Sequence, residues 1–213
     1  MRRDYIVVTG AQGCGKSVWA KQYTSGTSRL LVYDPTRSYP VNYDWDQRTG
    51  EEILIGKHKH FRIGIDNGDD LDMLCDMAYV SGDTTLLVEE AGVLFGRGQK
   101  LTSSVRRVIF MGRHRRVNLL LLAQRAVSIP VDLRSQANRF VSFRQIEEQD
   151  VAAVSGIMGK QYKSALPALP ELRCLDWCQG KVSVYDLHIS NNRANVPERE
   201  PIAETQTLDN DED

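Results

Sequence analysis

The feature that most constrains this chain is a glycine-rich segment near its start. Residues 10–17 read Gly-Ala-Gln-Gly-Cys-Gly-Lys-Ser, which is a glycine, four residues and then Gly-Lys-Ser. The β-branched residues of 5–9 predict a buried strand before this segment, and a helix is expected from Lys16 to about Tyr23. A strand, such a loop and a helix in this order predict a phosphate-binding loop, because glycines let backbone amides point at phosphate oxygens and the helix N-terminus adds partial positive charge.

The residues of this loop predict a site for ATP and magnesium. Lys16 is expected to bridge the β- and γ-phosphates, and Ser17 is expected to ligate Mg²⁺. A turn that contains a lysine by chance is the alternative, which the flanking strand and helix disfavour. The residues expected to bind the nucleotide are Gly10, Ala11, Gln12, Gly13, Cys14, Gly15, Lys16, Ser17 and Val18.

Apolar strands alternate with helices along the rest of the chain. Segments 36–56 and 95–100 are expected to be loops, and a hairpin that turns at Gln179-Gly180 is expected near the end. Near-continuous apolar strands separated by helices predict an α/β fold, with a central, mostly parallel sheet flanked by helices. The further strands are expected at 29–33, 60–65, 84–88, 118–123 and 139–143. The further helices are expected from Asn67, from a cap at Ser103 or Ser104 to Gly112 or Arg113, and over 147–157, with a short helix or turn at 129–137.

Polar side chains follow two of these strands. Glu89 and Glu90 come directly after a buried strand, at the carboxyl end where open α/β sheets bind their ligands. Glu89 is expected to hold the hydration shell of Mg²⁺, and Glu90 to polarise the attacking water. Aspartate is more usual at the first position, so the longer glutamate reaches the metal differently, and a solvated pair is the alternative. Gln124, after strand 118–123, is expected to orient water or touch the γ-phosphate, unless it is an ordinary strand-end residue.

Charge is distributed unevenly along the chain, although the net charge is −1. Residues 91–131 contain no acid and eight cations, whereas residues 190–213 contain seven acids and two arginines. The basic segment predicts contact with a polyanion, with a solvated helix face as the alternative. Because the tail has little apolar material, we expect one ATPase domain over 1–189 and an acidic disordered tail over 190–213.

Composition indicates a protein of the cytoplasm. No apolar run approaches the length of a membrane span, and the chain passes from Met-Arg-Arg-Asp directly into a strand, so no signal peptide is expected. The cysteines fit reduced thiols better than a metal site formed by Cys174 and Cys178 with His58 and His60.

The motifs together resemble the HerA–FtsK superfamily of DNA-pumping ATPases. The resemblance rests on loop 10–17, Leu-Val-Glu-Glu-Ala at 87–91, and Gly-Arg-His-Arg-Arg at 112–116 leading into the strand that ends at Gln124, and it covers about residues 5–145. Within that group, a short chain without added domains is most similar to the genome-packaging ATPases of tailless, internal-membrane viruses. The resemblance implies a RecA-like P-loop NTPase fold of the ASCE class with a C-terminal β-hairpin.

What the resemblance implies about function is a motor that hydrolyses ATP and packages viral double-stranded DNA into a preformed capsid. Its partners would be DNA in the pore of a homo-oligomeric ring, a hexamer, and proteins of the capsid vertex. The location would be the host cytoplasm, with retention at a virion vertex. A neighbouring subunit would supply an arginine finger, for which the candidates are Arg113, Arg115, Arg116 and Arg125, with Arg113 and Arg116 favoured.

Three alternatives stay open from the sequence. A filamentous-phage assembly ATPase of the zonula-occludens-toxin type normally carries a membrane span, which is missing here. A nucleotide or nucleoside kinase has no use for a water-activating Glu90 or for so many unopposed cations. A non-catalytic nucleotide-binding regulator would bind ATP without turnover. A GTPase is disfavoured because neither Asp-x-x-Gly nor Asn-Lys-x-Asp occurs.

Overall fold

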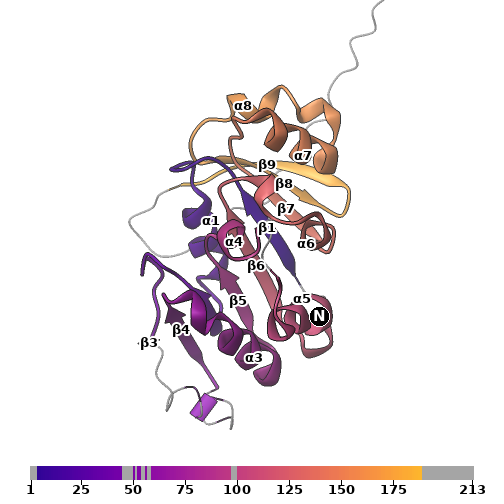
Figure 1. The fold of residues 1–213 in the computed structure, drawn as a ribbon. Coiled ribbons are helices and arrows are strands. Elements are labelled where there is room, and N and C mark those ends of the chain that lie inside the picture. Colours follow the sequence, from indigo (N-terminus) through magenta and orange to yellow (C-terminus); the bar gives the residue numbers. More distant parts are fainter. Residues whose placement is uncertain are drawn as a thin grey trace, which may run out of the picture.

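The computed structural model describes residues 4–44, 59–96 and 100–188, together with positions 50, 52, 53 and 56. Over these residues the strands form one nine-stranded sheet in the order β3-β4-β2-β5-β6-β1-β7-β8-β9 (Figure 1). The strands are β1 (Tyr5–Thr9), β2 (Arg29–Tyr33), β3 (Tyr43–Asp44), β4 (Phe61–Ile65), β5 (Thr85–Val88), β6 (Asn118–Ala123), β7 (Arg139–Ser142), β8 (Arg173–Cys178) and β9 (Lys181–Asp186).

Helices cover both faces of this sheet. Side chains of successive strand residues point to opposite faces, so Val7 joins one buried cluster and Val8 the other. The helix α1 packs Trp19 and Ala20 on the Val8 face, whereas α3, α5 and α7 cover the Val7 face. The longer helices are α1 (Lys16–Thr24), α3 (Leu71–Ser81), α5 (Ser103–Met111) and α7 (Glu148–Met158); the short helices and 3₁₀ turns are α4 (Ala91–Leu94), α6 (Val131–Arg134), α8 (Ala165–Ala168), η1 (Gly68–Asp70), η2 (Gly112–Arg115), η3 (Ala126–Ser128) and η4 (Lys160–Tyr162).

The strand directions confirm the predicted fold class. Strands β1 to β7 pair in parallel, and the pairings of β7 with β8 and of β8 with β9 at one edge are antiparallel. The hairpin turns where expected, because Gln179 and Gly180 both adopt positive φ angles of 53° and 85°, which suits the twist of a two-residue turn. The buried parallel strands therefore form the centre of an α/β layer architecture.

Local capping explains where two helices begin. The side chain of Asn67 accepts a hydrogen bond from the backbone N–H of Asp69 at 3.1 Å, which starts η1 and then α3 as the sequence predicted. The helix α5 begins at Ser103, but its cap is Thr102, whose Oγ1 accepts from the N–H of Val105 at 3.3 Å. The expected cap, Ser103 or Ser104, was therefore wrong by one or two residues.

The prediction of loops at 36–56 and 95–100 was only partly correct. The short strand β3 lies within the first segment and pairs in parallel with β4, with Tyr43 opposite Ile63. Two residues give almost no periodicity, so the sequence carries no strand signal there. Residues 50, 52 and 53 are helical, which the prediction also missed, and residues 45–49, 51, 54–55 and 97–99 lie outside the described residues.

The predicted division at 189/190 stays a prediction, because residues 189–213 lie outside the described part of the chain. Within the described part, no helix is both long and apolar enough to cross a membrane.

A nearly buried ion pair fixes the hairpin to the parallel sheet. The Nε of Arg139 in β7 donates to both carboxylate oxygens of Asp176 in β8, at 2.9 and 3.0 Å. Only 3% of the Asp176 side chain is exposed, and the Arg139 guanidinium also lies over the rings of Trp19 and Tyr23. Within the described part of the chain, Arg139 and Asp176 form no ion pair with any other residue, so the loss of one charge leaves the other buried without an ionic partner.

We therefore expect Asp176→Asn to lower the free energy of unfolding by about 3–5 kcal/mol, because it leaves the buried Arg139 charge without an ionic partner. The measurement is urea denaturation followed by circular dichroism. The matched control is Asp186→Asn in the same hairpin, which breaks the exposed pair with Arg173 and should cost much less. Equal losses in the two variants would show that burial does not set the strength of this contact.

Candidate nucleotide site

The segment 10–17 forms a tight loop between β1 and α1. Gly10, Gly13 and Gly15 adopt positive φ angles of 153°, 74° and 113°, which side chains rarely permit. A Cβ on Gly10 would also lie 2.6 Å from the Cβ of Phe143, so this position has no room for a side chain. The glycine spacing in the sequence thus corresponds to a real requirement of the backbone.

Neighbouring segments hold this loop in place. The N–H of Ala11 donates to the carbonyl oxygen of Arg144 at 2.9 Å, and the carbonyl of Cys14 accepts from the N–H of Leu172 at 3.0 Å. Inside the loop, the Cys14 Sγ–H donates to the Ala11 carbonyl at 2.7 Å. Burial raises the pKa of the Cys14 thiol, so it remains a neutral structural donor.

Lys16 and Ser17 begin α1 with their polar groups facing the site. The Nζ of Lys16 donates to the carbonyl oxygens of Gly10 and Ala11 at 2.9 and 3.0 Å, so the ammonium lies against the loop. The Oγ of Ser17 donates to Oε1 of Glu89 at 2.9 Å. A hydroxyl and a carboxylate oxygen are the hard oxygen ligands that Mg²⁺ prefers, so this pair fits a magnesium site.

Tyr39 completes the surroundings of Glu89. The Tyr39 hydroxyl donates to the same Glu89 Oε1 at 2.5 Å, and Glu89 is only 7% exposed. Burial and the adjacent carboxylate raise the pKa of Tyr39 far above its usual value, so its hydroxyl keeps its proton and acts as the donor. Tyr39 is not predicted from the sequence, because it lies 50 positions from Glu89 in a segment without a motif.

Glu90 points to a different neighbour from Glu89. Its backbone is left-handed, with φ 52° and ψ 36°, a conformation that costs a non-glycine residue about 1–2 kcal/mol. In this orientation, Glu90 Oε1 accepts a hydrogen bond from Nε2 of Gln124 at 3.2 Å. The acid pair is therefore divided between the Ser17 side and the Gln124 side of the site.

The buried side-chain amide of Gln145 lies next to Thr9, the residue directly before the phosphate loop. Gln145 is 2% exposed, and its Nε2 donates to the hydroxyls of Thr9 and Ser142 at 2.9 and 3.2 Å. It follows β7 as Gln124 follows β6, on the other side of β1. Gln145 was not among the predicted site residues, although its position shortly after a buried strand is a signal in the sequence.

The arginines before β6 lie at the opposite edge of the sheet from this site. Because β6 runs parallel to β1, with Tyr5 beside Leu119, the turn η2 lies where β1 begins rather than where it ends. Six residues of strand span about 20 Å. Arg113 and Arg116 therefore lie too far away to reach the phosphate loop of their own chain.

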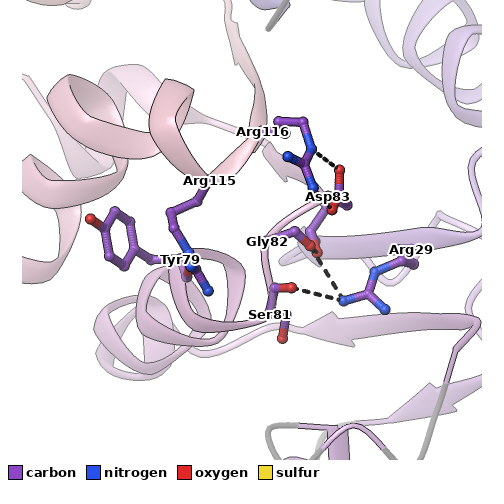
Figure 2. A network of polar contacts seen from close by, with 8 residues as sticks. Arg29, Tyr79, Ser81, Gly82, Asp83, Arg115 and Arg116 are labelled. Carbon is purple, nitrogen blue, oxygen red and sulfur yellow. Dashed lines mark hydrogen bonds and ion pairs between the residues drawn. The ribbon is translucent and has the colours of Figure 1, made fainter. Parts of the chain in front are cut away.

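Two of these arginines bind groups of their own subunit. Arg115 donates to the carbonyl oxygens of Tyr79 and Val80 at 3.0 and 2.7 Å, at the end of α3. Arg116 pairs with Asp83, whose pKa is lowered by that contact (Figure 2). Arg113 forms no ion pair with an acid among the described residues; its Nε lies 3.4 Å from Nε2 of His114.

Arg125, in contrast, lies at the nucleotide edge but is already paired. Its Nε donates at 2.9 Å to Oδ2 of Asp150, an aspartate only 2% exposed. The other oxygen of Asp150 accepts from the N–H of Val127 at 2.9 Å. This contact fixes the chain just after Gln124 to α7, which is a positioning role rather than a free guanidinium.

The remaining basic side chains lie on or before α5. Arg107 pairs with Asp76 at 2.9 Å, and Arg106 lies over the ring of Phe110. Lys100 is exposed, and Arg97 lies outside the described residues. The described residues contain no group of three or more His, Cys, Asp or Glu that could hold a metal ion, and the four cysteines are free.

Comparison with known proteins identifies the fold. Searches of protein-family models and of curated proteins found no match. Among solved structures, the genome packaging NTPase B204 of Sulfolobus turreted icosahedral virus 2, in complex with ATP-γS, matches with a TM-score of 0.74 at 18% identity over 86% of this chain and 97% of that one. VirB4 of Thermoanaerobacter pseudethanolicus matches with a TM-score of 0.60 at 10% identity over 88% of this chain and 90% of that one.

The N-terminal domain of zonular occludens toxin from Neisseria meningitidis matches less well. Its TM-score is 0.52 at 13% identity, over 89% of this chain and 96% of that one. The predicted resemblance to HerA–FtsK-type P-loop ATPases is thus confirmed at the level of the fold.

The strained backbone at Glu90 yields a test of this geometry. Removing the side chain with glycine should leave a more stable protein than removing it with alanine, by about 1 kcal/mol, because only glycine adopts the left-handed conformation without penalty. The measurement is the free energy of unfolding of Glu90→Gly and Glu90→Ala in urea.

The matched control is Glu148, in the first turn of α7, where alanine should be the more stable replacement. The same order at both positions would contradict the left-handed backbone at Glu90.

Proposed function

We propose that this protein is an ATPase that moves double-stranded DNA and packages a viral genome into a preformed capsid. The observation that carries the proposal is the convergence of five side chains at one edge of the sheet. These side chains belong to Lys16, Ser17, Glu89, Glu90 and Gln124. Together they supply a phosphate cradle, a pair of metal ligands and a base with its orienting partner.

In the proposed reaction, the phosphates of ATP lie in loop 10–17, where Lys16 turns from the loop carbonyls to the β- and γ-phosphates. Ser17 and Glu89 would hold Mg²⁺, Glu89 through the ion's hydration shell, and the ion would supply positive charge beside the phosphates. Glu90 accepts the proton of the attacking water, and Gln124 orients Glu90 and that water.

The Glu90–Gln124 contact favours hydrolysis over phosphoryl transfer to a second substrate. A kinase must keep water away from the γ-phosphate, so a carboxylate aligned by an amide at this point would waste ATP. The left-handed backbone at Glu90 supports a functional role for this residue, because backbone strain is concentrated at functional positions.

Double-stranded DNA is the polymer that the fold and the exposed cations Lys100, Arg106 and Arg113 favour. These three form no ion pair among the described residues, whereas Arg107, Arg115, Arg116 and Arg125 bind groups of their own subunit. Arginines and lysines neutralise phosphates without reading sequence, which suits a motor that must move along any DNA. The structure that matches with a TM-score of 0.74 is described as a genome packaging NTPase. An assembly or export ATPase is the second candidate, since the fold also matches the toxin domain, with a TM-score of 0.52.

A ring of identical subunits, a hexamer, would place each nucleotide between two copies. Arg113 is the better candidate for an arginine finger, because Arg116 already pairs with Asp83 and Arg125 with Asp150. The ring would act in the host cytoplasm and dock on proteins of a capsid vertex.

The direct test is ATP hydrolysis with and without double-stranded DNA. We expect DNA to stimulate turnover in a salt-sensitive way. Lys16→Ala should lose nucleotide binding. Glu90→Gln should bind ATP but lose turnover by about 10²–10⁴-fold, because this change removes only the acceptance of a proton. Normal turnover in Glu90→Gln would assign the base to another residue. Phosphate transfer to a small acceptor without DNA stimulation would indicate a kinase, and ATP binding without turnover a regulator.

Mixing variants tests the shared site. Arg113→Ala keeps the phosphate loop, and Lys16→Ala keeps the arginine, so each alone should be inactive while mixed rings regain partial hydrolysis. Arg116→Ala is the comparison and should need no rescue. Assembly is checked by light scattering. Intact rings of Arg113→Ala that Lys16→Ala subunits do not rescue would exclude Arg113 as the finger.

A further inference from the structure

Tyr39 lies in the magnesium half of the site without a role in the proposed reaction. Its ring is 5% exposed, and the ammonium of Lys21 in α1 lies 5.3 Å from the ring centroid. Its hydroxyl donates to Oε1 of Glu89, the oxygen that also accepts from Ser17. Two donors from different parts of the chain thus fix one carboxylate oxygen.

A polar turn after β2 places Tyr39 there. Oδ1 of Asp34 accepts from the N–H and the hydroxyl of Thr36 at 3.2 and 2.9 Å, and Oδ2 accepts from the N–H of Tyr39 at 2.7 Å. Asp34 is 4% exposed. Both of its carboxylate oxygens are therefore used to fold residues 34–39 back towards the site.

Backbone hydrogen bonds join the start of this turn to the ends of β4 and β5, the two neighbours of β2. The N–H of Asp34 donates to the carbonyl of Ile65 at the end of β4 at 2.8 Å. The N–H of Glu89 donates to the carbonyl of Tyr33 at 3.0 Å, directly before the turn. The backbone of Glu89 and the turn that carries Tyr39 are consequently parts of one hydrogen-bonded frame.

We propose that Tyr39 is a positioning residue, which holds the Glu89 carboxylate in place for the hydrated Mg²⁺ that accompanies ATP. The inference rests on the proposed function, because it needs a magnesium-dependent nucleotide site. Glutamate has one more rotatable bond than the usual aspartate, so its carboxylate needs an extra restraint, and Tyr39 supplies it. Partners in the second shell of a metal site typically change metal affinity 10–100-fold when they are removed.

The test is Tyr39→Phe, which keeps the buried ring and removes only the donor. We expect the Mg²⁺ concentration for half-maximal binding of a fluorescent ATP analogue to rise at least about 10-fold. Binding of the same analogue in EDTA should stay unchanged, because the Tyr39 hydroxyl acts on Glu89 and Ser17, the proposed magnesium ligands, and no hydrogen bond joins it to residues 10–16 among the described residues. Mn²⁺ titration followed by electron paramagnetic resonance, with the analogue present, gives a second readout that does not depend on turnover.

The matched control is Tyr23→Phe. The Tyr23 hydroxyl also donates to a carboxylate, that of Asp4, but at the edge of the sheet where β1 begins. This variant should keep the wild-type dependence on Mg²⁺. Wild-type dependence in Tyr39→Phe, or an equal shift in Tyr23→Phe, would overturn the positioning role. Wild-type protein whose nucleotide binding ignores Mg²⁺ would overturn the proposed magnesium site itself, and the inference with it.

Discussion

Parallel pairing on both sides of β6 decides where the polar side chains of this protein meet. β6 lies between β1 and β5, with Ala123 beside Thr9 and Leu121 beside Val88. Parallel strands that are in register end at the same edge of the sheet. The phosphate loop, the acid pair and Gln124 therefore converge, although they follow strands that are far apart in the sequence.

Much of this convergence could be predicted, because each part carries its own local signal. Loop 10–17 has glycines that the backbone requires, and Glu89 and Glu90 follow a strand that is apolar throughout. Gln124 was also expected near the γ-phosphate, and the pairing of β6 with β1 brings it to the same edge of the sheet as loop 10–17. What remained hidden was the hydrogen bond between Glu90 and Gln124, which depends on the left-handed backbone at position 90.

The residues that the sequence did not predict depend on contacts between distant segments. Tyr39 meets Glu89, and Gln145 meets Thr9 across 136 positions, so no spacing rule relates either pair. The arginines before β6 show the converse problem. They are close to Gln124 in the sequence, but the strand between them places them at the other edge of the sheet.

This separation restricts how copies of the chain can share a nucleotide site. An arginine at the amino edge and a phosphate loop at the carboxyl edge lie about one strand length, ~20 Å, apart in one subunit. A two-fold symmetric contact that brought Arg113 to the loop would have to cover both edges of each copy. A head-to-tail contact needs only the amino edge of one copy against the carboxyl edge of the next, and repetition of such a contact closes into a ring when the rotation permits. The geometry of the chain thus favours a ring over a symmetric dimer for any mechanism in which Arg113 acts on a neighbour's nucleotide.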